Sequence, residues 1–164
     1  MHRPPRIEGF TYTGPYAYMI TSCTHLRAST FLDGDFARTT LLHFRQAARA
    51  NAFEILAYCL MPNHAHFLVR GVAAHADLRP FVRIAKQRSG FEFARRTGGS
   101  RLWQEGYHDR VLRDADAILS VARYIVENPV RAGLVAQAED YEHSGSDVWT
   151  IGEILEAACW ERRR

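Results

Sequence analysis

The chain has 164 residues, 47% of them hydrophobic, which suits one compact domain with a buried core. The formal net charge of +3 is too small to indicate a nucleic-acid partner by itself. The sequence has no apolar run long enough to span a bilayer and no secretion signal at its start, and its three cysteines have no CxxC spacing. These features exclude membrane-spanning and disulfide-framework classes and predict a cytoplasmic protein.

After an irregular arm over residues 1–15, the pattern predicts a strand over 16–23 and a helix that begins at Asp35. Two further strands follow, over residues 53–60 and 65–69. They form a hairpin around Met61-Pro62-Asn63, because Pro62 cannot donate a hydrogen bond within a sheet.

Two histidines stand where the second strand of this hairpin begins. Residues two apart in a strand face the same side, about 7 Å apart, so His64 and His66 could bind one divalent metal ion together. A pair of surface or interior histidines without a metal is the alternative interpretation of the same spacing.

A second long helix is predicted from Asp77 to the glycine pair 98–99. Its Arg79, Arg83 and Lys86 form a basic stripe at helical spacing, which indicates either a contact with a DNA backbone or a solvated face. A fourth strand is expected within residues 101–112. Within that stretch Trp103 and Tyr107 are candidates for stacking on unpaired bases or for the core, and His108 is a third histidine for the metal or for proton transfer.

Residues 114–134 show a helical apolar stripe that starts near Asp114 or Asp116 and is interrupted at Pro129. Tyr124 and Asn128, four residues apart, lie on one side of this helix. Without further information, Tyr124 could be a half-buried tyrosine and Asn128 a helix cap. A last amphipathic helix is expected over residues 149–160.

The order β-α-β-β-α-β predicts an α+β fold of the ferredoxin-like, split β-α-β type. We expect an antiparallel sheet with helices on one face, followed by a C-terminal tyrosine-bearing helix. No repeat or linker divides the chain, so residues 1–164 are predicted as one domain, with an arm (1–15), a catalytic core (16–134) and a C-terminal extension (135–164).

Three segments in this order, YCLMPNHAHFLVR, LWQEGYHDRVLRD and RYIVENPVRAGLV, resemble the single-tyrosine HUH transposase superfamily, and most closely the REP-associated tyrosine transposases. The likeness runs from residue 16 to residue 134. It implies that His64 and His66 are metal ligands, that Tyr124 is the nucleophile and that Asn128 completes the metal site. Better-known members carry Gln at that last position, and Asn128 is one methylene shorter.

The resemblance further implies a metal-dependent transposase, with Mg²⁺ or Mn²⁺, that cleaves and rejoins single-stranded DNA hairpins through a 5′-phosphotyrosine intermediate. Such strand transfer conserves the phosphodiester energy and needs no nucleotide cofactor. A domesticated nucleic-acid-binding module that does not cleave, and an HUH nickase for plasmid replication or transfer, are the alternatives. The sequence leaves both a monomer and a homodimer open.

Overall fold

The computed structural model describes residues 9–112 and 114–161. Its larger elements, in chain order, are β1 (Ala17–Cys23), α1 (Gly34–Ala50), β2 (Phe53–Met61), β3 (His64–Gly71), α2 (Leu78–Arg96), β4 (His108–Leu112), α3 (Ala115–Val126), α4 (Asn128–Arg131), β5 (Ser144–Gly145) and α5 (Ile151–Glu161). The predicted element order is confirmed. Residues 1–8 of the predicted arm and the last three residues of the predicted extension lie outside the described part.

The five strands form one sheet in the order β4-β1-β3-β2-β5, with every neighbouring pair antiparallel. Strands β1 to β4 have the arrangement of a ferredoxin-like sheet, in which the first and third strands lie side by side at the centre. The predicted fold class is therefore confirmed. The fifth strand is an addition at the β2 edge that the sequence pattern did not predict.

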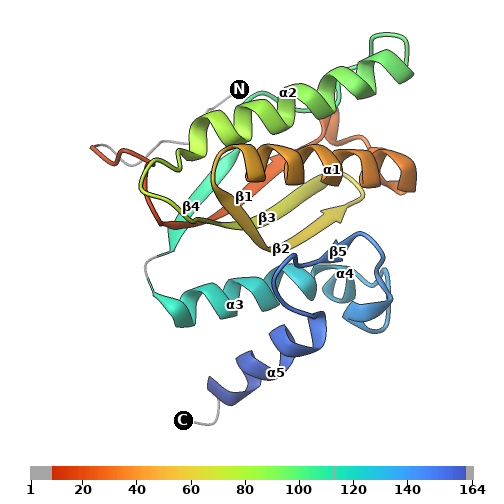
Figure 1. The fold of residues 1–164 in the computed structure, drawn as a ribbon. Coiled ribbons are helices and arrows are strands. Elements are labelled where there is room, and N and C mark those ends of the chain that lie inside the picture. Colours follow the sequence, from red (N-terminus) through yellow and green to blue (C-terminus); the bar gives the residue numbers. More distant parts are fainter. Residues whose placement is uncertain (1–8, 113, 162–164) are drawn as a thin grey trace.

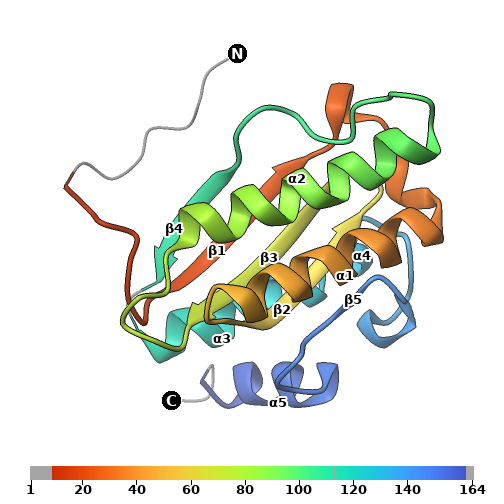
Figure 2. The ribbon, with the colours of Figure 1, turned by 45° about the horizontal axis from the view of Figure 1, so that its top comes forward.

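Helices α1 and α2 cover one face of the sheet (Figures 1 and 2). They bury an aromatic core in which the rings of Phe44 from α1 and Phe67 from β3 stack with centroids 4.1 Å apart. Side chains alternate along a strand, so Tyr18 and Ile20 of β1 enter this core. Ala17 and Met19, which alternate with these residues along β1, point to the other face.

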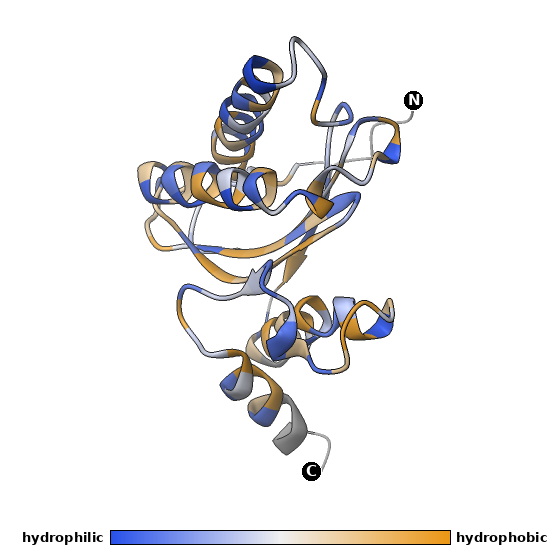
Figure 3. Cartoon of the chain, turned by 90° about the vertical axis from the view of Figure 1, so that its right-hand side faces the viewer, coloured by the Kyte–Doolittle hydropathy of each residue, from blue (hydrophilic) through white to orange (hydrophobic). Residues whose placement is uncertain are grey.

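Helix α3 covers the second face and α5 packs against α3, so the sheet lies between two helical layers (Figure 1). Val121, Ala122 and Ile125 of α3 pack with strand residues such as Leu68, and Ile154 of α5 is buried in the same cluster. The apolar sides of the helices on both faces turn toward the sheet in Figure 3. The tyrosine-bearing helix is thus one side of a second core.

Aspartates begin all three long helices before the C-terminal one. Asp77 and Asp114 accept hydrogen bonds from the backbone N–H groups of Arg79 and Ala117, as N-caps do. The expected start of α1 at Asp35 was wrong by one residue, because Asp33 is the cap and accepts from the N–H groups of Asp35 and Phe36. Among the described residues no helix is long and apolar enough to cross a membrane.

Candidate active site

The two histidines open β3 on the sheet face that α3 covers. Their ring centroids lie 4.7 Å apart, with the ring planes at 86°. Asn63 Oδ1 lies 2.7 Å from His64 Nδ1, and Thr21 Oγ1 lies 2.9 Å from His66 Nδ1. A carboxamide oxygen only accepts, so His64 carries its proton on Nδ1 and presents the lone pair of Nε2. When Thr21 accepts in the same way, His66 presents Nε2 as well.

Both imidazoles are held in the neutral form that a metal ligand needs. Burial, together with the nearby His64 and Arg131, lowers the pKa of His66 to about 4. Burial and the charge of Arg27 also lower the pKa of His64. Near neutral pH neither ring needs to lose a proton before it binds a cation.

The tyrosine helix places its hydroxyl-bearing ring beside this pair. The stripe of α3 that contains Val121 and Ile125 is buried against the sheet, which leaves Tyr124 on the flank and 46% exposed. The centroids of the Tyr124 and His66 rings are 6.2 Å apart. The structure thus brings together Tyr124 and His66, which the sequence analysis named in two separate segments.

Asn128 begins α4, with Pro129 in the first turn of that helix. Its Oδ1 accepts a hydrogen bond of 2.9 Å from Arg131 Nη2, and its buried Nδ2 has no hydrogen-bond partner within residues 9–112 and 114–161. Asn128 thus presents one oxygen, which already accepts a hydrogen bond from the positively charged guanidinium of Arg131.

Arg131 is a residue of this site that the sequence analysis missed. Its Nη2 also donates to the backbone oxygen of Tyr124 at 2.5 Å, and its Cζ lies 4.2 Å from the centroid of the Tyr124 ring. The available signal was spacing, because residues 124, 128 and 131 follow one side of a helical segment. Thr21 gave no such signal, because its contact with His66 depends on the pairing of β1 with β3.

The donor set tests whether a divalent ion fits here. No group of three His, Cys, Asp or Glu side chains in the described part of the chain could hold a metal ion. The residues present offer two neutral imidazole nitrogens and one carboxamide oxygen, which suit a divalent ion that takes its remaining ligands from water and phosphate. They fit an open catalytic site and do not form a closed structural one.

His108 lies on the same sheet face but farther away. It pairs with Thr21 across β4 and β1, and Thr21 pairs with His66 across β1 and β3. Two strand spacings of about 4.8 Å each therefore separate the backbones of His108 and His66. Its exposed side chain stands at the edge of the site.

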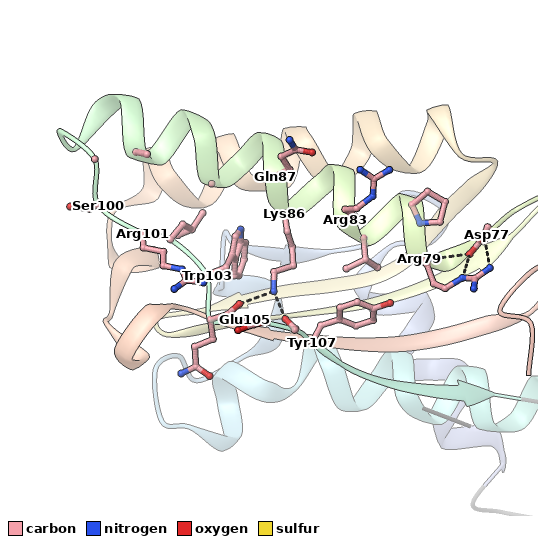
Figure 4. A pocket seen from close by; sticks show the side chains of 18 residues that line it. Asp77, Arg79, Arg83, Lys86, Gln87, Ser100, Arg101, Trp103, Glu105 and Tyr107 are labelled. Carbon is pink, nitrogen blue, oxygen red and sulfur yellow. Dashed lines mark hydrogen bonds and ion pairs between the residues drawn. The ribbon is translucent and has the colours of Figure 1, made fainter. Parts of the chain in front are cut away.

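The basic stripe of α2 borders a groove of about 1320 Å³ between this helix and the loop before β4 (Figure 4). Arg79 forms an ion pair with Asp77 at 2.7 Å, whereas Arg83 points away from the loop. Lys86 turns inward and donates to the backbone oxygens of Gln104, at 3.1 Å, and Gly106. The stripe is therefore not a uniform row of solvated cations.

The two aromatic candidates differ in how they lie in this groove. Trp103 is 6% exposed, its Nε1 donates to Ser89 Oγ at 3.0 Å, and its ring packs against Phe31 and Lys86. The ring is thus part of the core, which is one of the two interpretations of the sequence. Tyr107 lines the opposite wall of the groove and is only partly buried.

Fold and site together define the class of protein. A ferredoxin-like sheet with a histidine pair on its central strand and a helix tyrosine beside that pair is the arrangement of an HUH-type tyrosine transposase. The family described as "Transposase IS200 like" matches residues 14–128, more than half of the chain, and the chain belongs to that family. The expected family and enzyme class are thereby confirmed.

Individual relatives agree with this assignment. A protein of Haemophilus influenzae that carries the name of a REP-associated tyrosine transposase is 24% identical over 139 residues, 77% of each chain. A REP-associated tyrosine transposase bound to a REP hairpin is similar in structure, with a TM-score of 0.70 at 22% identity over 85% of this chain and 81% of the other. A Deinococcus radiodurans protein named as a transposase has a TM-score of 0.51 at 21% identity over 74% and 95%.

Proposed function

We propose that this chain cleaves and rejoins single-stranded DNA at hairpins or palindromic repeats, with Tyr124 as the nucleophile. One observation carries the proposal: the Tyr124 ring lies 6.2 Å from that of His66, next to a pair of neutral imidazoles. A structural tyrosine would not need this neighbourhood. The hairpin substrate is inferred from the related transposase whose structure contains a REP hairpin.

In the proposed reaction Tyr124 Oη attacks a backbone phosphorus. A bond forms between Oη and phosphorus while the bond from phosphorus to the 3′ oxygen breaks. The phenol loses its proton and the departing oxygen gains one, which leaves a 5′-phosphotyrosine and a free 3′-OH. Attack by a 3′-OH on this linkage reverses the exchange and joins strands, so no nucleotide cofactor is required.

We further propose that His64, His66 and Asn128 hold Mg²⁺ or Mn²⁺. A divalent cation supplies Lewis-acid stabilisation of a phosphoryl oxygen. The residues themselves do the positioning: Asn63 and Thr21 fix the two imidazole rings, and burial keeps the rings neutral. The oxygen of Asn128 is the third donor.

The DNA itself is proposed to pass along the α2 groove. Arg79, Arg83 and Lys86 form its basic wall, and the segment from Trp103 through Tyr107 to His108 leads from the groove to the edge of the histidine site. Arg83 and Tyr107 are the members of this set best placed to meet a strand, through a phosphate and a base respectively. Lys86 and Trp103 contribute by fixing the loop that forms the opposite wall.

The direct test is a covalent adduct. Wild-type protein is incubated with labelled single-stranded hairpin DNA and Mn²⁺ or Mg²⁺, and adducts that survive denaturation are scored on a gel. Tyr124→Phe removes the nucleophile. Tyr16→Phe is a matched control, because Tyr16 is 41% exposed and lies just before the first residue of β1, whereas His64 pairs with the last residue of that strand. We expect a metal-dependent adduct in the wild type and in Tyr16→Phe and none in Tyr124→Phe.

The same experiment separates the alternatives. A hairpin that binds the wild-type protein but yields no adduct at any metal concentration would indicate a binding module that does not cleave. An adduct that forms on unstructured DNA as readily as on hairpins would favour a nickase. An adduct that persists in Tyr124→Phe would refute the assigned nucleophile.

A further inference from the structure

Arg131 stands at the point where the proposed nucleophile and the proposed third metal ligand meet. Its guanidinium contacts Tyr124 twice, by a hydrogen bond to the backbone oxygen and by lying over the ring. It contacts Asn128 once, through Oδ1. The ion pair with Glu127 is loose, with 3.7 Å between Nη1 and Oε2. One side chain thus touches two of the groups on which the proposed chemistry depends.

The guanidinium also has donors to spare. Arginine carries five N–H groups, and the hydrogen bonds of Arg131 within the described residues all come from Nη2. The side chain is 42% exposed, so the remaining N–H groups can reach a ligand from solvent. A planar fork of this kind is suited to bidentate binding of a phosphate.

The contact with Asn128 fixes which atom of the carboxamide is engaged. A guanidinium only donates, so Asn128 must turn its oxygen, not its nitrogen, toward Arg131. The same oxygen is the only atom of this side chain that could bind a divalent cation. Asn128 Oδ1 has two lone pairs and Arg131 uses one of them, so in the DNA-free chain the like charges of the guanidinium and a divalent ion oppose their binding to the same oxygen.

An anion resolves this opposition. A DNA phosphate beside Tyr124 would offer Arg131 a negatively charged partner that can accept two parallel hydrogen bonds, in place of the single bond to the neutral carboxamide. Oδ1 would then be released, and the phosphate would reduce the repulsion between the two cations.

We propose that Arg131 binds the phosphate that Tyr124 attacks and, until DNA is present, withholds Asn128 from the metal. Metal binding and DNA binding are then coupled, and each strengthens the other. This inference rests on the proposed function of the site and adds to it an order of assembly. The ion becomes tightly held only when a substrate strand is in place, which restricts strand cleavage to a loaded site.

The coupling is tested by measuring Mn²⁺ affinity with and without DNA. Manganese is titrated by calorimetry into wild-type protein, Arg131→Leu and Arg123→Leu, each alone and with a saturating single-stranded hairpin. Arg123→Leu is the matched control, because Arg123 lies in the preceding helix α3 and pairs with the same Glu127 at 2.8 Å, as Arg131 does more loosely. Circular dichroism and thermal unfolding verify that each variant is folded.

Without DNA, Arg131→Leu is expected to bind Mn²⁺ roughly tenfold more tightly than wild type, the factor expected when one competing hydrogen bond to a charged group is lost. Addition of the hairpin should tighten Mn²⁺ binding in the wild type and in Arg123→Leu, but little in Arg131→Leu. The adduct should form more slowly in Arg131→Leu at saturating Mn²⁺ and recover in part in Arg131→Lys.

Equal or weaker Mn²⁺ binding by DNA-free Arg131→Leu would overturn the inference, because it would mean that Arg131 merely supports Asn128. An unchanged adduct rate in Arg131→Leu would overturn the phosphate contact. Either result, together with a normal wild-type adduct, leaves the proposed function intact. Absence of any adduct from the wild type would instead count against the proposed function itself.

Discussion

The buried His66 makes the stability of this protein depend on pH in a predictable window. The residue is only 7% exposed, and burial together with His64 and Arg131 lowers its pKa to about 4. In the unfolded chain an imidazole titrates near 6.5. The unfolded state therefore takes up a proton at mildly acidic pH while the folded state does not, and the free energy of unfolding falls as the pH falls from about 6.5 toward 4.

The size of the effect follows from the two pKa values. At pH 7 neither state is appreciably protonated, so His66 contributes almost nothing to the pH dependence there. At pH 5 the unfolded His66 is almost fully protonated and the folded one mostly neutral, which costs about 2 kcal/mol of unfolding free energy. A titrating group this well buried is a local determinant of acid stability.

Urea unfolding at pH 7 and pH 5, with EDTA present, measures the contribution of His66 to this pH dependence when wild type is compared with His66→Leu. The variant loses the Thr21 contact and therefore has a different stability at pH 7. The quantity compared is the decrease in unfolding free energy from pH 7 to pH 5 in each protein. Wild type should lose about 2 kcal/mol more than the variant between the two pH values. Equal losses in the two proteins would refute the assignment of the acid sensitivity to His66.

Three further changes test other parts of the structure. His64→Ala should weaken Mn²⁺ binding by at least roughly tenfold in calorimetry, and an unchanged affinity would remove the basis for the metal site. Ser89→Ala leaves the buried Trp103 N–H without its acceptor, so urea denaturation should show a loss of about 1–3 kcal/mol; a loss near zero would mean that the indole finds another partner. Asp114→Ala removes the cap of the tyrosine helix and should cost about 1 kcal/mol in thermal unfolding while the adduct still forms, and a stability equal to wild type would contradict the capping role.

The sequence predicted those parts of the fold that local chemistry determines. The apolar stripes and the capping residues Asp77 and Asp114 located the second and third helices, and alternating strands located the sheet. Spacing made the histidine pair and the helix tyrosine candidates, and the resemblance to HUH transposases implied their roles; the structure places His64, His66 and Tyr124 together.

What the sequence could not predict depends on contacts between distant segments. Lys86 belongs to a basic stripe by helical spacing, but the loop before β4 folds over α2 and supplies the carbonyl groups that draw it inward. Strand β5 is two residues long, too short to leave a periodic pattern. The contact of Thr21 with His66 requires the register of two strands that are far apart in the chain.

The short strand β5 has a consequence for how the β2 edge of the sheet meets other chains. The segment around it covers the outer edge of β2, where Leu60 donates to the backbone oxygen of His143, Tyr58 pairs with Gly145, and Asp147 donates to the backbone oxygen of Ile55. Bare strand edges recruit other strands and lead to aggregation. This segment lies beyond residue 128, where the family match ends, yet it covers the β2 edge of the sheet, while β4 forms the opposite edge. A chain cut after Leu134 should therefore form aggregates even though every proposed catalytic residue is retained, and light scattering would detect them.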